Sequence, residues 1–199
     1  YHPGINPVSL VKALRDNIKA GRIVRGGSTI TMQVARLSRG SRQRTYGEKI
    51  IEILQALKLE IFRSKSHILK MYVANAPFGG NSVGLDAASW RYLGKPPGDI
   101  TWAEASALAI LPNAPSLVYP GRNQEILLKR RNELLGKLLE RRFIDSLTYT
   151  LSLDEPLPGI PKQLPSLAPH ITDQFYILNR GERVRTTIDP ALQEMTVDI

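Results

Sequence analysis

Apolar residues recur at three- and four-residue spacing through the first three quarters of the sequence, and this helical period limits the fold more than any other feature. Asn6-Pro7 is typical of a helix start, and Gly21 and Gly40 are typical of helix ends. The stripes expected to face the core are Leu10, Val11, Leu14 and Ile18; then Ile30, Val34 and Leu37; then Ile50, Leu54, Leu57 and Ile61. The pattern predicts a mainly α fold.

Further helices are expected in the middle of the chain. Residues 66–75 and 85–93 form two of them, and capping boxes begin others at Thr45/Glu48 and Thr101/Glu104. The Ala/Leu-rich segment 105–111 is predicted to be buried all round. Asn123 is expected to cap a long helix with Ile126, Leu127, Leu134, Leu135, Leu138 and Leu139 on one side. Arg130 and Arg131 are expected at its surface, with buried stems and solvated charges.

The character of the sequence changes near Leu153. Four prolines between positions 156 and 165 exclude a helix there and predict a linker over residues 151–182. Residues 174–178 and 183–188 are rich in β-branched and aromatic side chains, so a strand pair is expected, followed by a helix start at Asp189-Pro190.

Charge points to the class of partner. The 199 residues carry a formal net charge of +9. Ten of the Lys and Arg residues lie in positions 1–50, against only Asp16 and Glu48. Such a basic region favours an anionic partner, either a membrane surface or a phosphorylated substrate. Nucleic acid is the weakest choice, because few aromatic side chains interleave with the bases.

Metal and disulfide chemistry receive no support from composition. The chain has no cysteine, and its three histidines are scattered without ligand spacing. No run of 18 apolar residues is present.

One stretch combines features of an anion site. Gly26-Gly27-Ser28-Thr29 leads into a helix through Gln33, so backbone N–H groups and hydroxyls gather at a helix start. A plain loop entering a plain helix has the same pattern. Farther along, Glu52 lies opposite the predicted core stripe with small Ala56 one turn on. It could line a cleft, although spacing alone favours a solvated surface glutamate.

The order of Tyr1–Gly4, Gly26–Gln33, Lys49, Glu52, Ile68–Tyr72 and Arg130-Arg131 along the chain resembles that of the motifs of the peptidoglycan glycosyltransferases, the transferase domain of class A penicillin-binding proteins, most like its 1C type. Gly26–Gln33 is similar to the Gly-Gly-Ser-Thr-Ile-Thr-Gln-Gln motif. Tyr1-His2-Pro3-Gly4 looks like the tail of the first motif. The third motif is matched by Lys49, Glu52, Ala56, Leu59 and Glu60, the fourth by Ile68–Tyr72 and the fifth by Arg130-Arg131. Ala76–Gly80, Ala88–Trp90 and Leu111–Pro115 resemble the 1C type.

The resemblance implies a lysozyme-like glycosyltransferase domain over residues 1–150, truncated within the first motif. A linker over 151–182 and the start of a transpeptidase domain over 183–199 would follow, with a short β segment there. The implied reaction polymerises lipid II into glycan strands with inversion, and undecaprenyl diphosphate leaves. The family's general base is the first-motif glutamate, which would fall before Tyr1, so this fragment alone is expected to be inactive.

The same resemblance implies roles for particular residues. Glu52 would be the second family glutamate, orienting groups near the leaving diphosphate. Substrate contacts are expected from Lys12, Gly26, Gly27, Ser28, Thr29, Gln33, Arg36, Arg44 and Lys49. No metal-ligating residue and no required cofactor are predicted, although Mg²⁺ or Mn²⁺ could sit at the diphosphate. The sequence departs from the family at Lys12, Met32, Arg36, Glu48 and Ala74, where the family usually has Arg, Gln, Lys, Arg and Asn.

The implied partners are lipid II, the growing glycan strand, the membrane surface and a transpeptidase domain of the same chain, without nucleic acid. The implied location is the periplasmic face of the bacterial inner membrane. Two alternatives stay open at this point. One is a muralytic hydrolase of lysozyme-like fold, and the other is a non-catalytic module that binds membrane surfaces.

Overall fold

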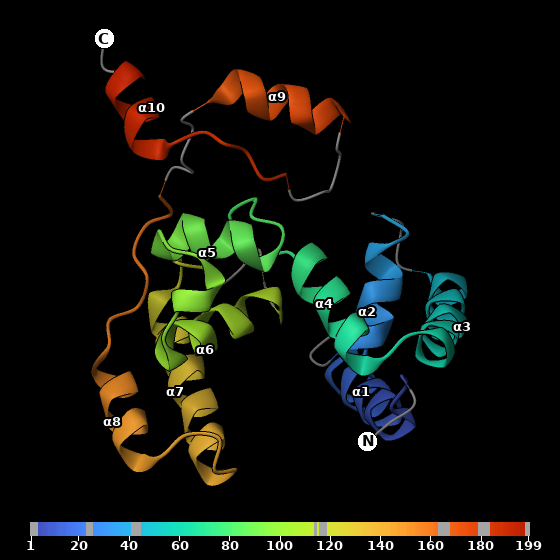
Figure 1. Cartoon of the computed structure of the whole chain (residues 1–199). Helices are drawn as coiled ribbons and strands as arrows, with labels where there is room; N and C mark the ends of the chain where they lie inside the picture. The colour runs from blue at the N-terminus through green and yellow to red at the C-terminus, as the bar shows by residue number, and fades with distance from the viewer. Residues whose placement is uncertain are drawn as a thin grey trace. The chain divides into compact units, whose positions relative to one another are not determined.

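The computed structural model describes residues 4–22, 26–40, 45–113, 115, 119–162, 168–178 and 184–197. The chain divides into two compact units, Tyr1–Lys162 and Gln163–Ile199 (Figure 1). The first unit contains the helices α1 (Pro7–Ala20), α2 (Ile30–Leu37), α3 (Tyr46–Phe62), α4 (Lys65–Asn75), α5 (Leu85–Leu93), α6 (Trp102–Ile110), α7 (Gln124–Glu140) and α8 (Ser146–Asp154), and the short turns η1 (Pro97–Asp99) and η2 (Leu111–Asn113). The second contains α9 (Pro169–Leu178) and α10 (Pro190–Val197).

Side-chain caps set most of the helix starts. Asn6, Thr29, Thr45, Ser64 and Asp145 each accept a hydrogen bond from a backbone N–H in the first turn that follows. At Thr101 the full capping box forms with Glu104. Asn123 precedes α7 without a side-chain cap, and the Glu48 carboxylate pairs with Arg39. The expected cap at Asn123 is therefore wrong, and at Thr45 only the hydroxyl half of the box is confirmed.

Two groups of packed helices make up the first unit. In one group α2 packs against both α3 and α4; in the other α6 packs against α7, and α8 packs against both. Helix α5 contacts α4 and α6, so it links the groups (Figure 1). The main hydrophobic cluster joins the turn after α4 and helix α5 to the second group and consists of Ala76, Phe78, Ala88, Tyr92, Leu108, Ile110, Leu111 and Leu127.

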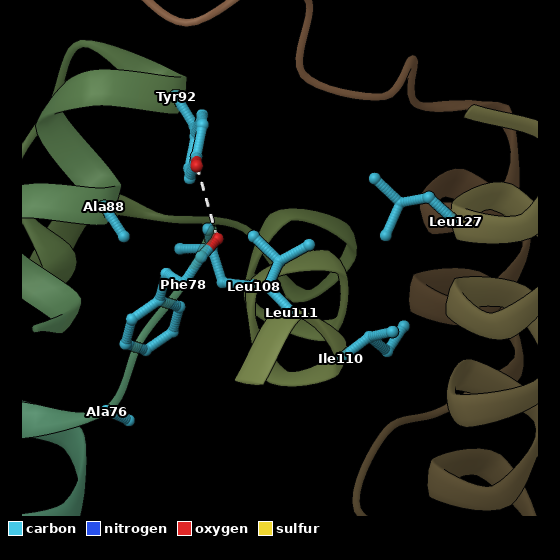
Figure 2. Packing of buried hydrophobic residues seen from close by; sticks show 8 residues of the cluster. All are labelled: Ala76, Phe78, Ala88, Tyr92, Leu108, Ile110, Leu111 and Leu127. Atoms are coloured by element: carbon cyan, nitrogen blue, oxygen red, sulfur yellow. Dashed lines mark hydrogen bonds between the residues drawn. The ribbon is translucent and has the colours of Figure 1, made fainter. Parts of the chain in front are cut away.

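The centre of that cluster combines apolar packing with one polar anchor. Phe78, Leu108 and Leu111 converge in Figure 2, where the Tyr92 hydroxyl donates to the Phe78 carbonyl at 3.2 Å. The same hydroxyl lies 2.7 Å from the Gly79 carbonyl. Burial raises the pKa of Tyr92 above its ordinary value of 10.0. A buried phenol needs such partners, and here it secures the turn after α4.

Helix α3 faces the opposite way from the sequence prediction. Its apolar stripe is exposed, with Ile50 at 60%, Leu54 at 61% and Ile61 at 77% of full accessibility. Glu52 and Ala56, on the other face, are buried at 8% and 0%. The prediction that this stripe meets the core is wrong. Periodicity identifies an apolar face of a helix, but it does not identify what that face packs against. On α1, Val11 and Ile18 are likewise exposed, and Ala13 is buried.

Arg131 is a second correction. It is not a solvated surface residue: its exposed fraction is 1%. The guanidinium donates to the Glu155 carbonyl at 2.5 Å and to the Leu153 carbonyl at 3.0 Å. Burial lowers its pKa, and the Glu155 carboxylate partly offsets this. Arg130, one position earlier, is exposed as expected.

Residues 155–162, which we call the anchored strap, are hydrogen-bonded to other parts of the first unit. The Pro158 carbonyl accepts from Gln124, the Glu155 carboxylate accepts from Thr101, and the Lys162 N–H donates to the Arg91 carbonyl at 2.7 Å. Prolines 156, 158 and 161 are non-helical, as predicted. The preceding helix, α8, was not predicted. The compact unit thus extends beyond position 150 to Lys162, and the functional division into transferase, linker and transpeptidase start stays a prediction.

The predicted strand pair is wrong. Residues 174–178 belong to α9, and residues 184–189 carry no strand; in the described ranges, strand-like pairing is limited to two isolated bridges, Pro77 with Val83 and Tyr119 with Arg122. A short apolar run cannot separate strand from helix, and Pro169 at the first helical position was the overlooked helix signal. The helix start at Asp189-Pro190 is confirmed, because the Asp189 carboxylate accepts from Ala191 N–H.

Candidate functional site

The Gly26–Thr29 loop is fixed against its surroundings before α2 begins. A Cβ added to Gly27 would lie 3.0 Å from the Leu10 Cα and 3.1 Å from the Ser9 carbonyl, so the loop backbone approaches α1 closely. The Thr29 hydroxyl accepts from the Met32 N–H and donates to the Gly4 carbonyl at 2.5 Å. The loop therefore presents the first turn of α2 in one orientation, with N–H groups that need outside acceptors.

The buried face of α3 brings a cation and a carboxylate to this loop. Lys49 Nζ donates to the Ser28 hydroxyl oxygen at 2.5 Å and pairs with Glu52 Oε2 at 3.0 Å. The Glu52 side chain is 10% exposed and that of Lys49 is 34% exposed. An ammonium has three N–H donors, and two are used by these contacts. The arrangement holds Lys49 in place and leaves part of its side chain accessible to an anion from the solvent side.

A second group joins α2 to α4. The Tyr72 hydroxyl lies 3.3 Å from Gln33 Oε1, to which it donates. Burial raises the pKa of Tyr72 above 10.0, while the positive charge of nearby Arg36 opposes the shift. Gln33 is therefore oriented by a neutral phenol, and Arg36 lies close enough to this pair for its charge to act on the phenol.

The predicted site residues are thus partly assembled. Ser28, Lys49 and Glu52 are in direct contact, Thr29 is bound to Gly4, and Gln33 with Arg36 lies by Tyr72. Lys12 is exposed on α1, and Gly26 is exposed in the loop. Arg44 and the residues Tyr1, His2 and Pro3 lie outside the described residues.

Two residues absent from the predicted site are prominent in it. Thr31, 3% exposed, donates its hydroxyl to Glu60 Oε1 at 2.6 Å. Glu60 also pairs with Lys65 at 2.6 Å. Glu60 is eight residues after Glu52, so the helical period places both on one face. Glu60 was matched to the third motif from the sequence but was given no role, because the opposite face of this helix was expected to be buried.

A groove of about 610 Å³ lies between α2, α3 and α4. Apolar side chains line much of it, and two cations accompany them: the lining residues are Val34, Ala35, Ser38, Gln55, Lys58, Leu59, Phe62, Arg63 and Met71. The sequence analysis did not predict this groove, because it forms where three helices separated in sequence come together.

Metal binding finds no ready-made site in the described part of the chain. No group of three or more His, Asp or Glu residues is placed there to hold an ion. Glu52, the carboxylate of the site, already pairs with Lys49. In the same described ranges, no helix combines the length and apolar character that crossing a membrane requires.

Comparison with known proteins decides the family. The family model described as Transglycosylase matches residues 1–139. The chain belongs to the transglycosylase family. That assignment confirms the resemblance drawn from the ordered motifs.

The similar proteins are named as penicillin-binding proteins. The chain is 40% identical over 192 residues to Penicillin-binding protein 1C of Escherichia coli, covering 96% of this chain and 25% of that protein. It is 35% identical to Penicillin-binding protein 1A of Aquifex aeolicus, covering 98% of this chain and 28% of that one. It therefore spans about a quarter of the length of these curated relatives.

A crystal structure of Penicillin-Binding Protein 1A from Haemophilus influenzae is also similar. The TM-score is 0.43 at 21% identity, over 77% of this chain and 20% of that one.

Proposed function

We propose that this transglycosylase-family chain is part of an enzyme that polymerises lipid II into the glycan strands of bacterial peptidoglycan. The observation that carries the proposal is the contact of Lys49 with both Ser28 and Glu52 beside the start of α2. A cation, hydroxyls and first-turn N–H groups then converge where a diphosphate can bind. Family membership over residues 1–139 supports the same reaction.

The residues divide the work of an inverting transfer. The acceptor 4-hydroxyl attacks the anomeric carbon, the bond to the diphosphate oxygen breaks, and undecaprenyl diphosphate leaves with the bonding electrons. Lys49 with the α2 N–H groups stabilises the charge that develops on the diphosphate. Glu52 holds Lys49 in position; Lys12, Arg36 and Arg44 add positive charge, and Thr29 and Gln33 add polar contacts. The hydroxyl proton goes to the first-motif glutamate of the family, which the resemblance places ahead of Tyr1.

Two further features fit a lipid diphosphate substrate. The 610 Å³ groove has an apolar lining of a kind that accepts hydrocarbon, and Lys58 and Arg63 line it too. The first fifty residues supply a basic surface for an anionic membrane, in keeping with action at the periplasmic face of the inner membrane. The transpeptidase domain of the same full-length protein and the growing glycan strand are the remaining proposed partners.

Among the residues that the structure describes, no preformed carboxylate or histidine site is available to a divalent cation at the diphosphate. The described carboxylates form no cluster, so Mg²⁺ or Mn²⁺ would take most of its ligands from the substrate and water. The proposed mechanism accordingly assigns charge stabilisation to lysine, arginine and backbone N–H groups.

The test is polymerisation of labelled lipid II by the full-length protein and by its Glu52→Gln variant. We expect the wild type to make glycan strands and the variant to lose about 10²-fold or more of the turnover rate. Glu48→Gln is a matched control, because Glu48 lies one turn earlier on α3 and pairs with Arg39 at 2.8 Å. It should retain near-wild-type turnover, because Glu48 and Arg39 are not among the proposed site residues.

Other outcomes would replace the proposal. A Glu52→Gln variant within threefold of wild type would remove Glu52 from the mechanism. Release of soluble muropeptides from sacculi, without strand synthesis, would indicate a muralytic hydrolase. Vesicle binding that lipid II does not compete with, in a protein without turnover, would indicate a membrane-surface module.

A further inference from the structure

Glu60 connects three segments that surround the candidate site. Its Oε1 accepts from the Thr31 hydroxyl at 2.6 Å, and its Oε2 pairs with Lys65 Nζ at 2.6 Å. The Glu60 side chain is 11% exposed and Thr31 is 3% exposed, so little water competes for these contacts. A hydrogen bond to an ionised carboxylate is about twice as strong as one between neutral groups. Glu60 therefore ties the end of α3 to the starts of α2 and α4.

The backbone at Gly4 rests on the same side chain. Gly4 has φ of +78°, and a Cβ there would collide with the Glu60 Cγ and lie 3.2 Å from the Ala56 carbonyl. Only glycine adopts this conformation and this approach at low cost. On its other side, the Gly4 carbonyl accepts from Thr29. Gly4, the last residue of the segment that resembles the first motif, is thus held between α3 and the substrate-binding loop.

We propose that Glu60 is a positioning residue for glycosyl transfer. It acts through its contacts with Thr31 and Gly4. Thr31 fixes the first turn of α2, and Gly4 fixes the end of the first-motif segment. The inference rests on the proposed function, since it assigns Glu60 the role of keeping the first turn of α2 and the first-motif segment at a fixed separation in that site. A misplacement of about 1 Å between reacting groups costs about 10²-fold in rate.

Three variants of the full-length protein test this role. In Glu60→Gln the ion pair with Lys65 is lost. Thr31→Val keeps the shape of the side chain and removes the hydroxyl, whereas Thr31→Ser keeps the hydroxyl. We expect Glu60→Gln and Thr31→Val to lower kcat for lipid II polymerisation about tenfold or more, with KM changed less than about threefold. Thr31→Ser should stay within about twofold of wild type, because it restores the donor to Glu60.

The matched control is Glu104→Gln on α6. Glu104 pairs with Lys95 at 2.7 Å and is 15% exposed, so its ion pair closely resembles that of Glu60 with Lys65. This variant should lower the melting temperature and leave kcat unchanged, because it lies outside the proposed machinery.

The outcomes separate the two proposals. If the wild type polymerises lipid II and Glu60→Gln keeps kcat within twofold, the positioning role is wrong. It is also wrong if Glu104→Gln loses as much kcat as Glu60→Gln for the same drop in melting temperature. If Glu60→Gln does not fold, the Val and Ser variants at Thr31 decide: equal kcat in both overturns the role. A wild type without polymerising activity refutes the proposed function, and the positioning role with it.

Discussion

Replacing Arg131 with methionine isolates the energetic role of one buried cation. The guanidinium satisfies the carbonyls of Leu153 and Glu155, and its Nε donates to Asn132 at 3.0 Å. Methionine has similar length and no donors, so both carbonyls lose their partner. A buried acceptor left without a donor costs about 1–3 kcal/mol. Part of this is offset, because the variant no longer pays to bury a charge, a cost visible in the lowered pKa of Arg131.

The expected net loss of unfolding free energy is about 3 kcal/mol. For a unit of this size each kcal/mol shifts the melting temperature by about 2–4 °C, so a decrease of about 10 °C should be measured. Hydrogen exchange in the full-length protein gives the local readout. The Lys162 amide, bonded to the Arg91 carbonyl at 2.7 Å, and the rest of the anchored strap should exchange faster.

Arg130→Met is the control for this measurement, because Arg130 is the adjacent arginine and is exposed. Its unfolding free energy should change by no more than about 0.5 kcal/mol. The reasoning about Arg131 fails if both variants melt within about 2 °C of wild type, or if strap exchange is unchanged in Arg131→Met.

Three further outcomes follow from burial and titration. Leu127→Ala should cost about 2–5 kcal/mol in chemical denaturation, whereas Leu128→Ala, at a site 41% exposed, should cost far less. Asp145 has its pKa lowered below 3.8 by the Thr148 N–H, so its stabilisation of α8 is present at neutral pH and is lost as pH falls through the lowered pKa; Asp145→Asn should remove this acid dependence in a circular-dichroism titration. Tyr72 should ionise above pH 10.0 in a near-ultraviolet difference titration against Tyr72→Phe, and a normal midpoint would contradict its burial.

Helix positions were largely readable from the sequence because they are set locally. Asn6, Thr45 and Thr101 mark helix starts because their side chains accept hydrogen bonds from the first turn, and these bonds need no tertiary contact. The exceptions are instructive. Helix α8, which Asp145 caps, ends directly before the proline-rich segment and was not predicted; α9 contains side chains with a preference for strands.

Which face of a helix is buried could not be predicted in the same way. On α3 the buried face carries Lys49, Glu52 and Glu60, which satisfy one another or partners on α2 and α4. Buried polar side chains of this kind depend on partners distant in sequence. A local sequence pattern does not contain those partners, so it favours burial of the apolar stripe instead. Arg131 was misjudged for the same reason, because its acceptors lie more than twenty residues later.

The candidate site shows a similar division. Motif resemblance selected Ser28, Lys49 and Glu52, and the structure brings these three together. No role was predicted for Thr31, because its hydrogen bond to Glu60 joins two helices and is not visible in a local sequence pattern. The roles assigned to the individual residues stay predictions until the variants are measured.

The exposed stripe of α3 has a consequence for sequence variation. At Leu127, a buried position, volume is constrained, and even the loss of a methylene is felt. At Leu54 and Ile61 nothing in the described part of the first unit encloses the side chain. Exchange among leucine, isoleucine, valine and methionine at these positions should therefore leave the folding of that unit unaffected. The fold would tolerate serine there as well. Packing within the described unit therefore limits neither hydropathy nor shape at these positions, whereas it limits both at Leu127.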